Sequence, residues 1–88
     1  MTFLTSGVDR SGSAGLGSTL VVAANSQRRG LTFQNLSDHD MWLTETDRPA
    51  EAGVGYRVIP FESFSVSTCS AIHVFTGVAS APFAATEY

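Results

Sequence analysis

From residue 19 onward, short runs of β-branched and aromatic residues alternate with polar residues and are separated by turn-forming residues. A period of two is typical of half-buried strands, and no segment carries the longer apolar stripe of a helix. The strands that this pattern predicts are Thr19–Ala24, Gly30–Leu36, Met41–Thr44, Tyr56–Ile59, Ser63–Ser67, Ala71–Thr76 and Pro82–Glu87. Seven short strands indicate an all-β fold, a small antiparallel β-sandwich or barrel.

The beginning of the chain has a different composition. Residues 6–18 hold eight Gly or Ser in thirteen positions, which is the composition of a flexible linker. We therefore expect a β-sandwich domain over residues 19–88, preceded by a flexible Gly/Ser-rich N-terminal arm over residues 1–18. Phe3 and Leu4 lie near the start of that arm, and they either belong to a frayed terminus or dock on a neighbouring subunit.

The second and third predicted strands are close in sequence, and we expect them to pair as a hairpin. A loop made of Asp38, His39 and Asp40 suits the turn chemistry of aspartate and keeps the apolar residues of both strands on one face. That inward face carries Leu31, Phe33, Met41 and Leu43. Asn35 falls on it too, and because a buried amide must be hydrogen-bonded, we expect Asn35 to bond the backbone of a neighbouring loop.

The same hairpin sets Leu36 opposite Trp42 on its outer face. Three interpretations of this apolar pair remain open: another segment covers it, a partner protein binds it, or a sugar stacks on it. Leu36 and Trp42 are therefore candidate partner-binding residues.

Arg28 and Arg29 form the most concentrated positive charge, in the turn that leads into the strand Gly30–Leu36. We expect Gly30 to supply an unusual backbone angle in that turn. The two arginines are either solvated at the tip of the turn, or one of them forms a bidentate pair with a carboxylate, in this chain or on an acidic protein partner. Both are candidate partner-binding residues.

Composition narrows the class of protein. The chain has 88 residues, of which 43% are hydrophobic and 15% charged, and its net charge is −3. A core of this size is marginal, so association with other subunits would add stability. The acidic balance argues against a nucleic-acid partner, and no apolar run is long enough to predict a membrane span. Cys69 is the single cysteine, so we expect no intrachain disulfide, as is usual in a reducing cytosol.

Residues with reactive side chains do not gather in the sequence. His39 lies between two aspartates in a predicted turn, and His73 alternates with apolar residues of a strand. A metal needs three or four converging ligands, and a serine or a cysteine nucleophile such as Cys69 needs a histidine base. The sequence therefore predicts no catalytic residue, no metal site and no cofactor.

The segment Asn25–Ser37 resembles a pattern of small tailed-bacteriophage and prophage virion proteins. It has an Asn-x-x-Arg-x-Gly turn and then an alternating strand that ends in Asn-x-Ser. In those proteins an aromatic-containing strand follows, here Met41–Thr44, and then a Gly-rich loop with an apolar strand, here Gly53–Pro60. They close with strands similar to Ala71–Gly77 and to the final Thr86–Tyr88.

The resemblance covers roughly residues 20–88 and implies a virion structural protein with no reaction and no cofactor. A capsid decoration or cement protein is the favoured type, with a tail or neck accessory protein or a glycan-binding adhesin module as alternatives. The implied partners are the major capsid protein or other virion proteins, together with copies of the chain itself, a trimer being favoured. Such a late protein is assembled in the bacterial host cytoplasm and resides in the virion. The family often has Pro-Gly after the fourth strand, where this chain has Pro60-Phe61.

Overall fold

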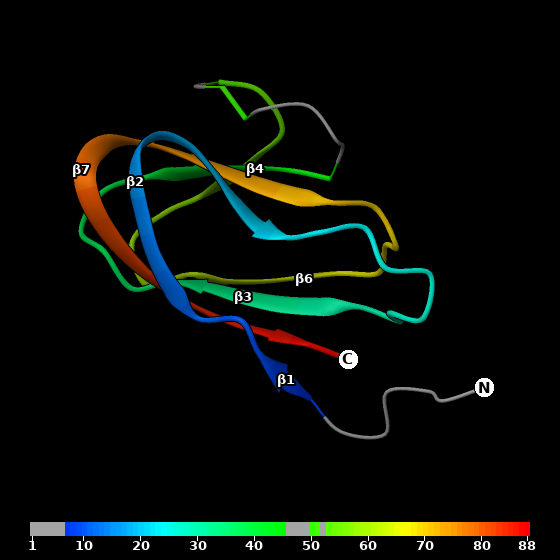
Figure 1. Cartoon of the computed structure of the whole chain (residues 1–88). Coiled ribbons are helices and arrows are strands. Elements are labelled where there is room, and N and C mark those ends of the chain that lie inside the picture. The colour runs from blue at the N-terminus through cyan, green and yellow to red at the C-terminus, as the bar shows by residue number, and fades with distance from the viewer. Residues whose placement is uncertain (1–6, 46–49, 52) are drawn as a thin grey trace.

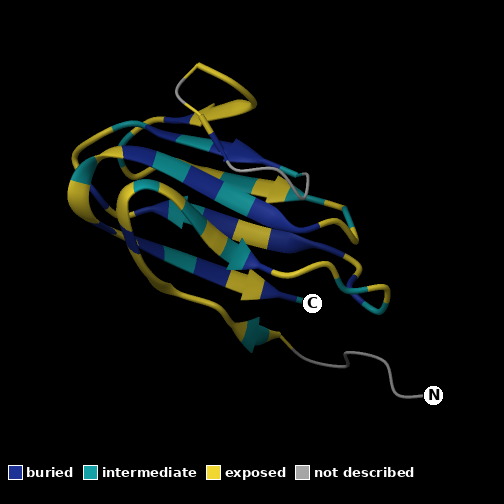
Figure 2. Cartoon of the chain, turned by 45° about the horizontal axis from the view of Figure 1, so that its top comes forward, coloured by how far each residue is buried: buried dark blue, intermediate teal, exposed yellow. Residues whose placement is uncertain are grey.

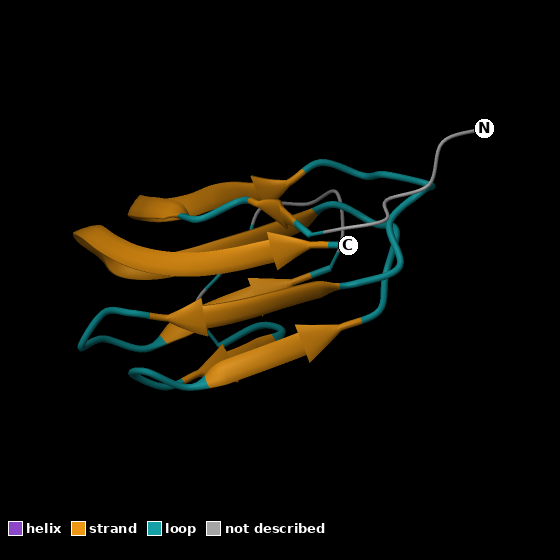
Figure 3. Cartoon of the chain, turned by 90° about the horizontal axis from the view of Figure 1, so that it is seen from below, coloured by secondary structure: helices purple, strands orange, loops and turns teal. Residues whose placement is uncertain are grey.

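The computed structural model describes residues 7–45, 50–51 and 53–88. Over these residues the chain forms seven strands, and Figure 3 shows strands and loops alone. The strands are β1 (Val8–Asp9), β2 (Gly12–Val22), β3 (Leu31–Asn35), β4 (Met41–Thr44), β5 (Tyr56–Val58), β6 (Ser63–Val66) and β7 (Ile72–Glu87). They make one antiparallel sheet that is nearly closed into a barrel, which confirms the predicted all-β class. The described residues include no helix of the length and apolarity needed to cross a membrane.

The long strand β7 lies in the middle of this sheet. One of its edges pairs with β1 and β2, and its other edge pairs with β4 near its start and with β3 near its end. The strand order is therefore β5-β4-β7-β3-β6, with β1 and β2 alongside β7. Figure 1 shows β2 and β7 curving together through one arch. Because β7 belongs to both walls of the sheet, it holds the two walls together.

The arch coincides with an irregularity in the pairing of β2 with β7. Gly15 pairs with Ser80 but Gly17 pairs with Thr76, so three residues of β7 (77–79) lie opposite the single residue Leu16 of β2. Gly17 has a φ of 93°, a backbone angle that glycine adopts without strain. Extra residues in one strand bend a ladder, and here they turn the inward face of β7 from even-numbered to odd-numbered positions. The buried positions are Ile72, Val74 and Thr76 before the bend and Ala81, Phe83 and Ala85 after it.

Buried and exposed residues alternate along the strands, as Figure 2 shows, and the buried apolar residues pack into one core cluster. Its largest fully buried apolar side chains are Phe33, Leu31, Met41, Leu43, Ile72, Val58 and Val74. The rings of Phe33 and Phe83 stack with their centroids 5.2 Å apart. At the two ends of the strand order, Tyr56 of β5 contacts Phe64 of β6 with a centroid distance of 4.8 Å. The sheet therefore closes at this seam through an aromatic contact.

The structure corrects the predicted boundary of the N-terminal arm. Strand β2 starts at Gly12, so residues 12–18 belong to the sheet, and Ala14 is completely buried. The Gly/Ser-rich segment is a strand because the long edge of β7 supplies partners for its backbone groups, which outweighs its low strand propensity. Phe3 and Leu4 lie outside the described residues.

Two predictions about the strands, one on their number and one on their pairing, are also wrong. Ala71–Thr76 and Pro82–Glu87 are parts of the one strand β7, and β3 and β4 each pair with β7 rather than with one another. Leu36 therefore does not lie opposite Trp42, whose partners are residues of β5 and β7. The inward face survives this correction, because the apolar residues assigned to it in both strands are buried.

Two glycines of the loop before β5 allow a matched test of how closely this loop packs against β4. Gly55 has a φ of 93°, and a Cβ there would collide with the carbonyl oxygen of Leu43, whereas Gly53 has a φ of 77° and faces open space. We expect Gly55→Ala to lower the free energy of unfolding by about 3 kcal/mol or more, since strain and a backbone clash combine. Gly53→Ala should cost about 1 kcal/mol, from the backbone angle alone. Urea denaturation measures both, and equal losses would contradict the close approach of Gly55 to β4.

Candidate functional site

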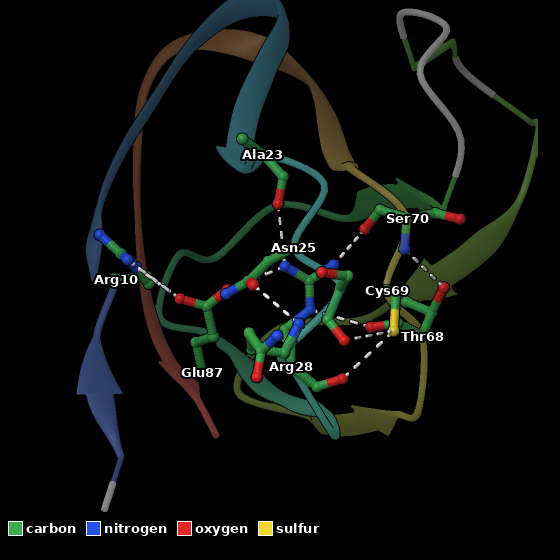
Figure 4. Close-up of polar contacts among 10 residues, drawn as sticks. Arg10, Ala23, Asn25, Arg28, Thr68, Cys69, Ser70 and Glu87 are labelled. Carbon is green, nitrogen blue, oxygen red and sulfur yellow. Dashed lines mark hydrogen bonds and ion pairs between the residues drawn. The ribbon is translucent and has the colours of Figure 1, made fainter. Parts of the chain in front are cut away.

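Arg28 is the centre of a buried polar cluster in the turn after β2, shown in Figure 4. Its side chain is 0% exposed, and its guanidinium donates to the Ala23 and Thr68 carbonyl oxygens, each at 2.9 Å. It also donates to the Ser70 carbonyl oxygen and, at 2.8 Å, to Oε2 of Glu87. These acceptors come from the end of β2, the turn between β6 and β7, and the end of β7. One planar side chain therefore fixes three segments of the chain.

Glu87 is the anion of this cluster, and its side chain is only 3% exposed. Its Oε1 accepts from Nε and Nη2 of Arg10 at 3.1 and 3.0 Å, and its Oε2 accepts from Nδ2 of Asn25 at 3.4 Å in addition to Arg28. Burial by itself raises the pKa of Glu87, but the hydrogen bonds from Arg28, Arg10 and Asn25 outweigh it and hold the pKa below its ordinary value. Glu87 is therefore a carboxylate held in the charged form.

These contacts test the predictions made for Arg28 and Gly30 in this turn. Arg28 pairs with a carboxylate of this chain, Glu87, but through one hydrogen bond and not the expected bidentate pair. Because Arg28 is buried within the chain, its assignment as a partner-binding residue is wrong. Arg29 is exposed and stays a predicted partner-binding residue. Gly30 is not among the described residues with positive φ; a Cβ there would lie 2.8 Å from the Tyr88 hydroxyl oxygen. Close approach of Tyr88 thus explains this glycine.

Asn35, at the end of β3, forms a second buried cluster that matches the prediction. Its Nδ2 donates to the carbonyl oxygens of His39 at 2.7 Å and Val58 at 3.0 Å. Its Oδ1 accepts from the backbone N–H of Ser37 at 2.9 Å and from the Ser37 hydroxyl at 2.7 Å. Asn35 is completely buried and uses all four of its amide hydrogen-bonding positions. It thereby joins the loop after β3 to β5.

The two aspartates of the loop after β3 differ in their contacts. Oδ2 of Asp40 accepts from Nε of Arg57 at 2.8 Å and lies 2.7 Å from its Nη2, which ties the start of β4 to β5. Asp38 is exposed, and its Oδ1 lies 3.3 Å from Nε2 of the exposed His39. Asp40 therefore links its loop to β5, whereas Asp38 presents a carboxylate to solvent.

Within residues 7–45, 50–51 and 53–88, no three His, Cys, Asp or Glu side chains come together as metal ligands would. Cys69 is exposed, and its Sγ lies 3.3 Å from the Arg28 carbonyl oxygen. An open hollow of about 300 Å³ runs beside the Arg10–Glu87 pair along the end of β2. The polar contacts of this region are ion pairs and hydrogen bonds that join segments of the chain.

Large apolar side chains are exposed on β2, in the segments after β3 and β5, and at Val54 and Tyr56. Leu16 and Leu20 of β2 are 71% and 51% exposed. Leu36, Ile59 and Phe61 follow β3 and β5, and Phe61 is 62% exposed. Leu36 is thus accessible, as a candidate partner-binding residue must be, and Trp42 is half-buried. Sequence reasoning missed Phe61, although an aromatic residue directly after Pro60, where glycine is common, was the available signal.

Comparisons of this chain with family models, with curated proteins and with solved structures find no match. Function is therefore inferred from the residues and their geometry.

The Arg28 cluster gives a matched pair of substitutions. Arg28→Lys replaces a planar donor by a point charge that cannot reach all of its acceptors, so we expect it to lower the free energy of unfolding by about 3 kcal/mol. Arg29→Lys, one residue away and exposed, should change it by less than about 0.5 kcal/mol. Urea denaturation of both variants checks this, and equal effects would contradict the role of Arg28 in fixing three segments of the chain.

Glu87 also predicts how stability depends on pH. A carboxyl group whose pKa is lower in the folded state stabilises the fold above the pKa of the unfolded chain, near 4.5, and that stabilisation is lost as pH falls toward the folded pKa. The free energy of unfolding of wild type should exceed that of Glu87→Gln most at about pH 7, and the gap should narrow below about pH 4.5. A gap that does not change with pH would show that Glu87 is not held in the charged form.

Proposed function

We propose that this chain is a non-enzymatic structural protein of a tailed-bacteriophage virion, and that it decorates the capsid as a cement protein. The resemblance over Asn25–Ser37 supports this proposal, and the contacts explain why such a pattern would be kept. Arg28 joins three segments, Gly30 admits Tyr88, and Asn35 fixes two loops. The residues that carry the resemblance are therefore framework residues of this fold.

The observation that carries the proposal is the exposure of large apolar side chains on a small, rigid sheet. Among the described residues, seven large apolar residues are at least 40% exposed: Leu16, Leu20, Leu36, Val54, Tyr56, Ile59 and Phe61. Apolar surface that gathers in patches is typical of a protein that binds another protein. The described surface thus suits attachment, and the ion pairs and buried amide below it keep that surface in a fixed shape.

Attachment to a shell makes a weak contact effective. A capsid repeats the same surface many times, and linked copies of a small protein bind such an array far more strongly than one copy does. The chain is therefore proposed to act as a homo-oligomer, with a trimer favoured, whose copies bridge neighbouring capsid subunits. A domain of this size also gains stability from being held by neighbours.

Particles of the encoding phage, produced with and without this gene, test the proposal. We expect the protein in purified wild-type particles, on the head by immunogold labelling, and as a trimer by sedimentation equilibrium of the isolated protein. Particles that lack it should release their DNA at a lower temperature, because the bridges between capsid subunits are missing.

Absence of the protein from purified particles would refute the virion assignment. Labelling of the tail or neck would replace the cement role by an accessory role. Binding to host glycans that is lost in Trp42→Ala would favour an adhesin module instead.

A further inference from the structure

The turn between β5 and β6 holds an aromatic residue in a conformation that favours glycine. Pro60 is its second residue, Phe61 its third, and the Glu62 N–H donates to the Ile59 carbonyl oxygen at 3.1 Å. Phe61 has a φ of 64°, and among the described residues it is the one non-glycine with positive φ. This is the pattern of a type II turn, in which the third position is normally Gly or Asn. A bulky side chain there is strained.

Strand β3 imposes this conformation through the backbone of Phe61. The Phe61 N–H donates to the Asn35 carbonyl oxygen at 2.8 Å, and the Phe61 carbonyl oxygen accepts from Nε2 of Gln34 at 3.1 Å. The Asn35 N–H in turn donates to the Glu62 carbonyl oxygen at 3.1 Å. Because Asn35 is itself fully hydrogen-bonded and buried, the turn has a fixed position.

The side chain of Phe61 gains little from burial, since the residue is 62% exposed. The protein thus carries two unfavourable features at one residue, backbone strain and an exposed aromatic ring. Strained residues whose conformation is imposed by their surroundings are concentrated at functional sites. An exposed aromatic ring on a backbone that hydrogen bonds hold in place is also the kind of side chain that anchors protein interfaces, because little backbone freedom is lost on binding.

Exposed apolar residues lie next to this turn along the backbone: Ile59 begins the turn, and Leu36 follows Asn35, whose carbonyl oxygen accepts from the Phe61 N–H. Leu36 and Ile59 are 40% and 44% exposed, and Pro82 is exposed beside Leu36, whose N–H donates to the Pro82 carbonyl oxygen at 3.1 Å. We call the residues Leu36, Ile59, Phe61 and Pro82 the Phe61 surface.

Acidic side chains border the Phe61 surface. Glu62 follows Phe61 and is exposed, and Asp38 follows Leu36 by two residues with its side chain 86% exposed. A complementary partner would present an apolar pocket with basic side chains on its rim. In a second copy, Arg10, Arg28 and Arg57 are already ion-paired with carboxylates of their own chain, so self-association through this surface would have to use another cation, such as the exposed Arg29.

We infer that the Phe61 surface is the contact through which the protein attaches to the shell, an inference that rests on the proposed function. Phe61 enters an apolar pocket of the capsid protein, and the carboxylates of Glu62 and Asp38 face Lys or Arg side chains on the rim of that pocket.

Phe61→Gly separates a binding role from a structural one, because the two roles predict opposite changes in stability. Glycine relieves the strain at this backbone angle, so we expect the melting temperature to rise by about 2–5 °C. The same variant loses the anchor, so its affinity for particles made without this gene should fall about 30-fold or more, as measured by co-sedimentation. Phe61→Tyr keeps the ring and should bind these particles as wild type does.

Leu16→Ser is the matched control, since it removes an apolar side chain that is at least as exposed (71%) from the arch of β2, and it should leave particle binding unchanged. Wild-type binding should also weaken as salt is added, and less so in the double variant Asp38→Asn, Glu62→Gln.

Three results would overturn the inference alone, with wild-type binding intact. They are unchanged binding by Phe61→Gly, a lower melting temperature of that variant, and loss of self-association instead of particle binding. Failure of wild type to bind the particles would refute the proposed function, and this inference with it.

Discussion

The backbone hydrogen bonds of β7 are the interaction on which the rest of this structure depends. One edge of β7 satisfies β1 and β2, and the other satisfies β4 and β3, so four strands share this one neighbour. Buried backbone groups must be paired, and without β7 the two walls of the sheet would have no common member. The bend at residues 77–79 lets one strand serve both walls, because the ladder with β2 absorbs the extra residues there.

Two buried polar residues fix the loops to the sheet, one before the start of β3 and one at its end. Arg28 ties the turn after β2 to Glu87 of β7, and Asn35 ties the loop after β3 to β5. Through its backbone, Asn35 also fixes the turn in which Phe61 stands exposed. The buried Asn35 therefore holds the strained backbone of Phe61, and with it the position of the exposed ring.

The pattern of neighbouring residues predicted those features of the fold that depend on neighbouring residues alone. Strands β3 to β6 and the inward orientation of Asn35 could be predicted, because alternation of apolar and polar residues reports which face is buried. Residues 12–18 could not, since their composition is that of a linker and only pairing with distant β7 makes them a strand. The contact between Arg28 and Glu87 joins positions 59 residues apart, and no local pattern encodes it. The strain at Phe61 could be recognised only from its backbone φ in the structure.

Amide hydrogen exchange, measured residue by residue by NMR, tests the role of β7 most directly. If one continuous strand unites both walls, the paired amides of Ile72–Thr76 and of Ala81–Glu87 should open with the same free energy, equal to that of global unfolding. If one half of β7 opens at a much lower free energy than the other, the two walls are separate units, and β7 is not the element that holds them together.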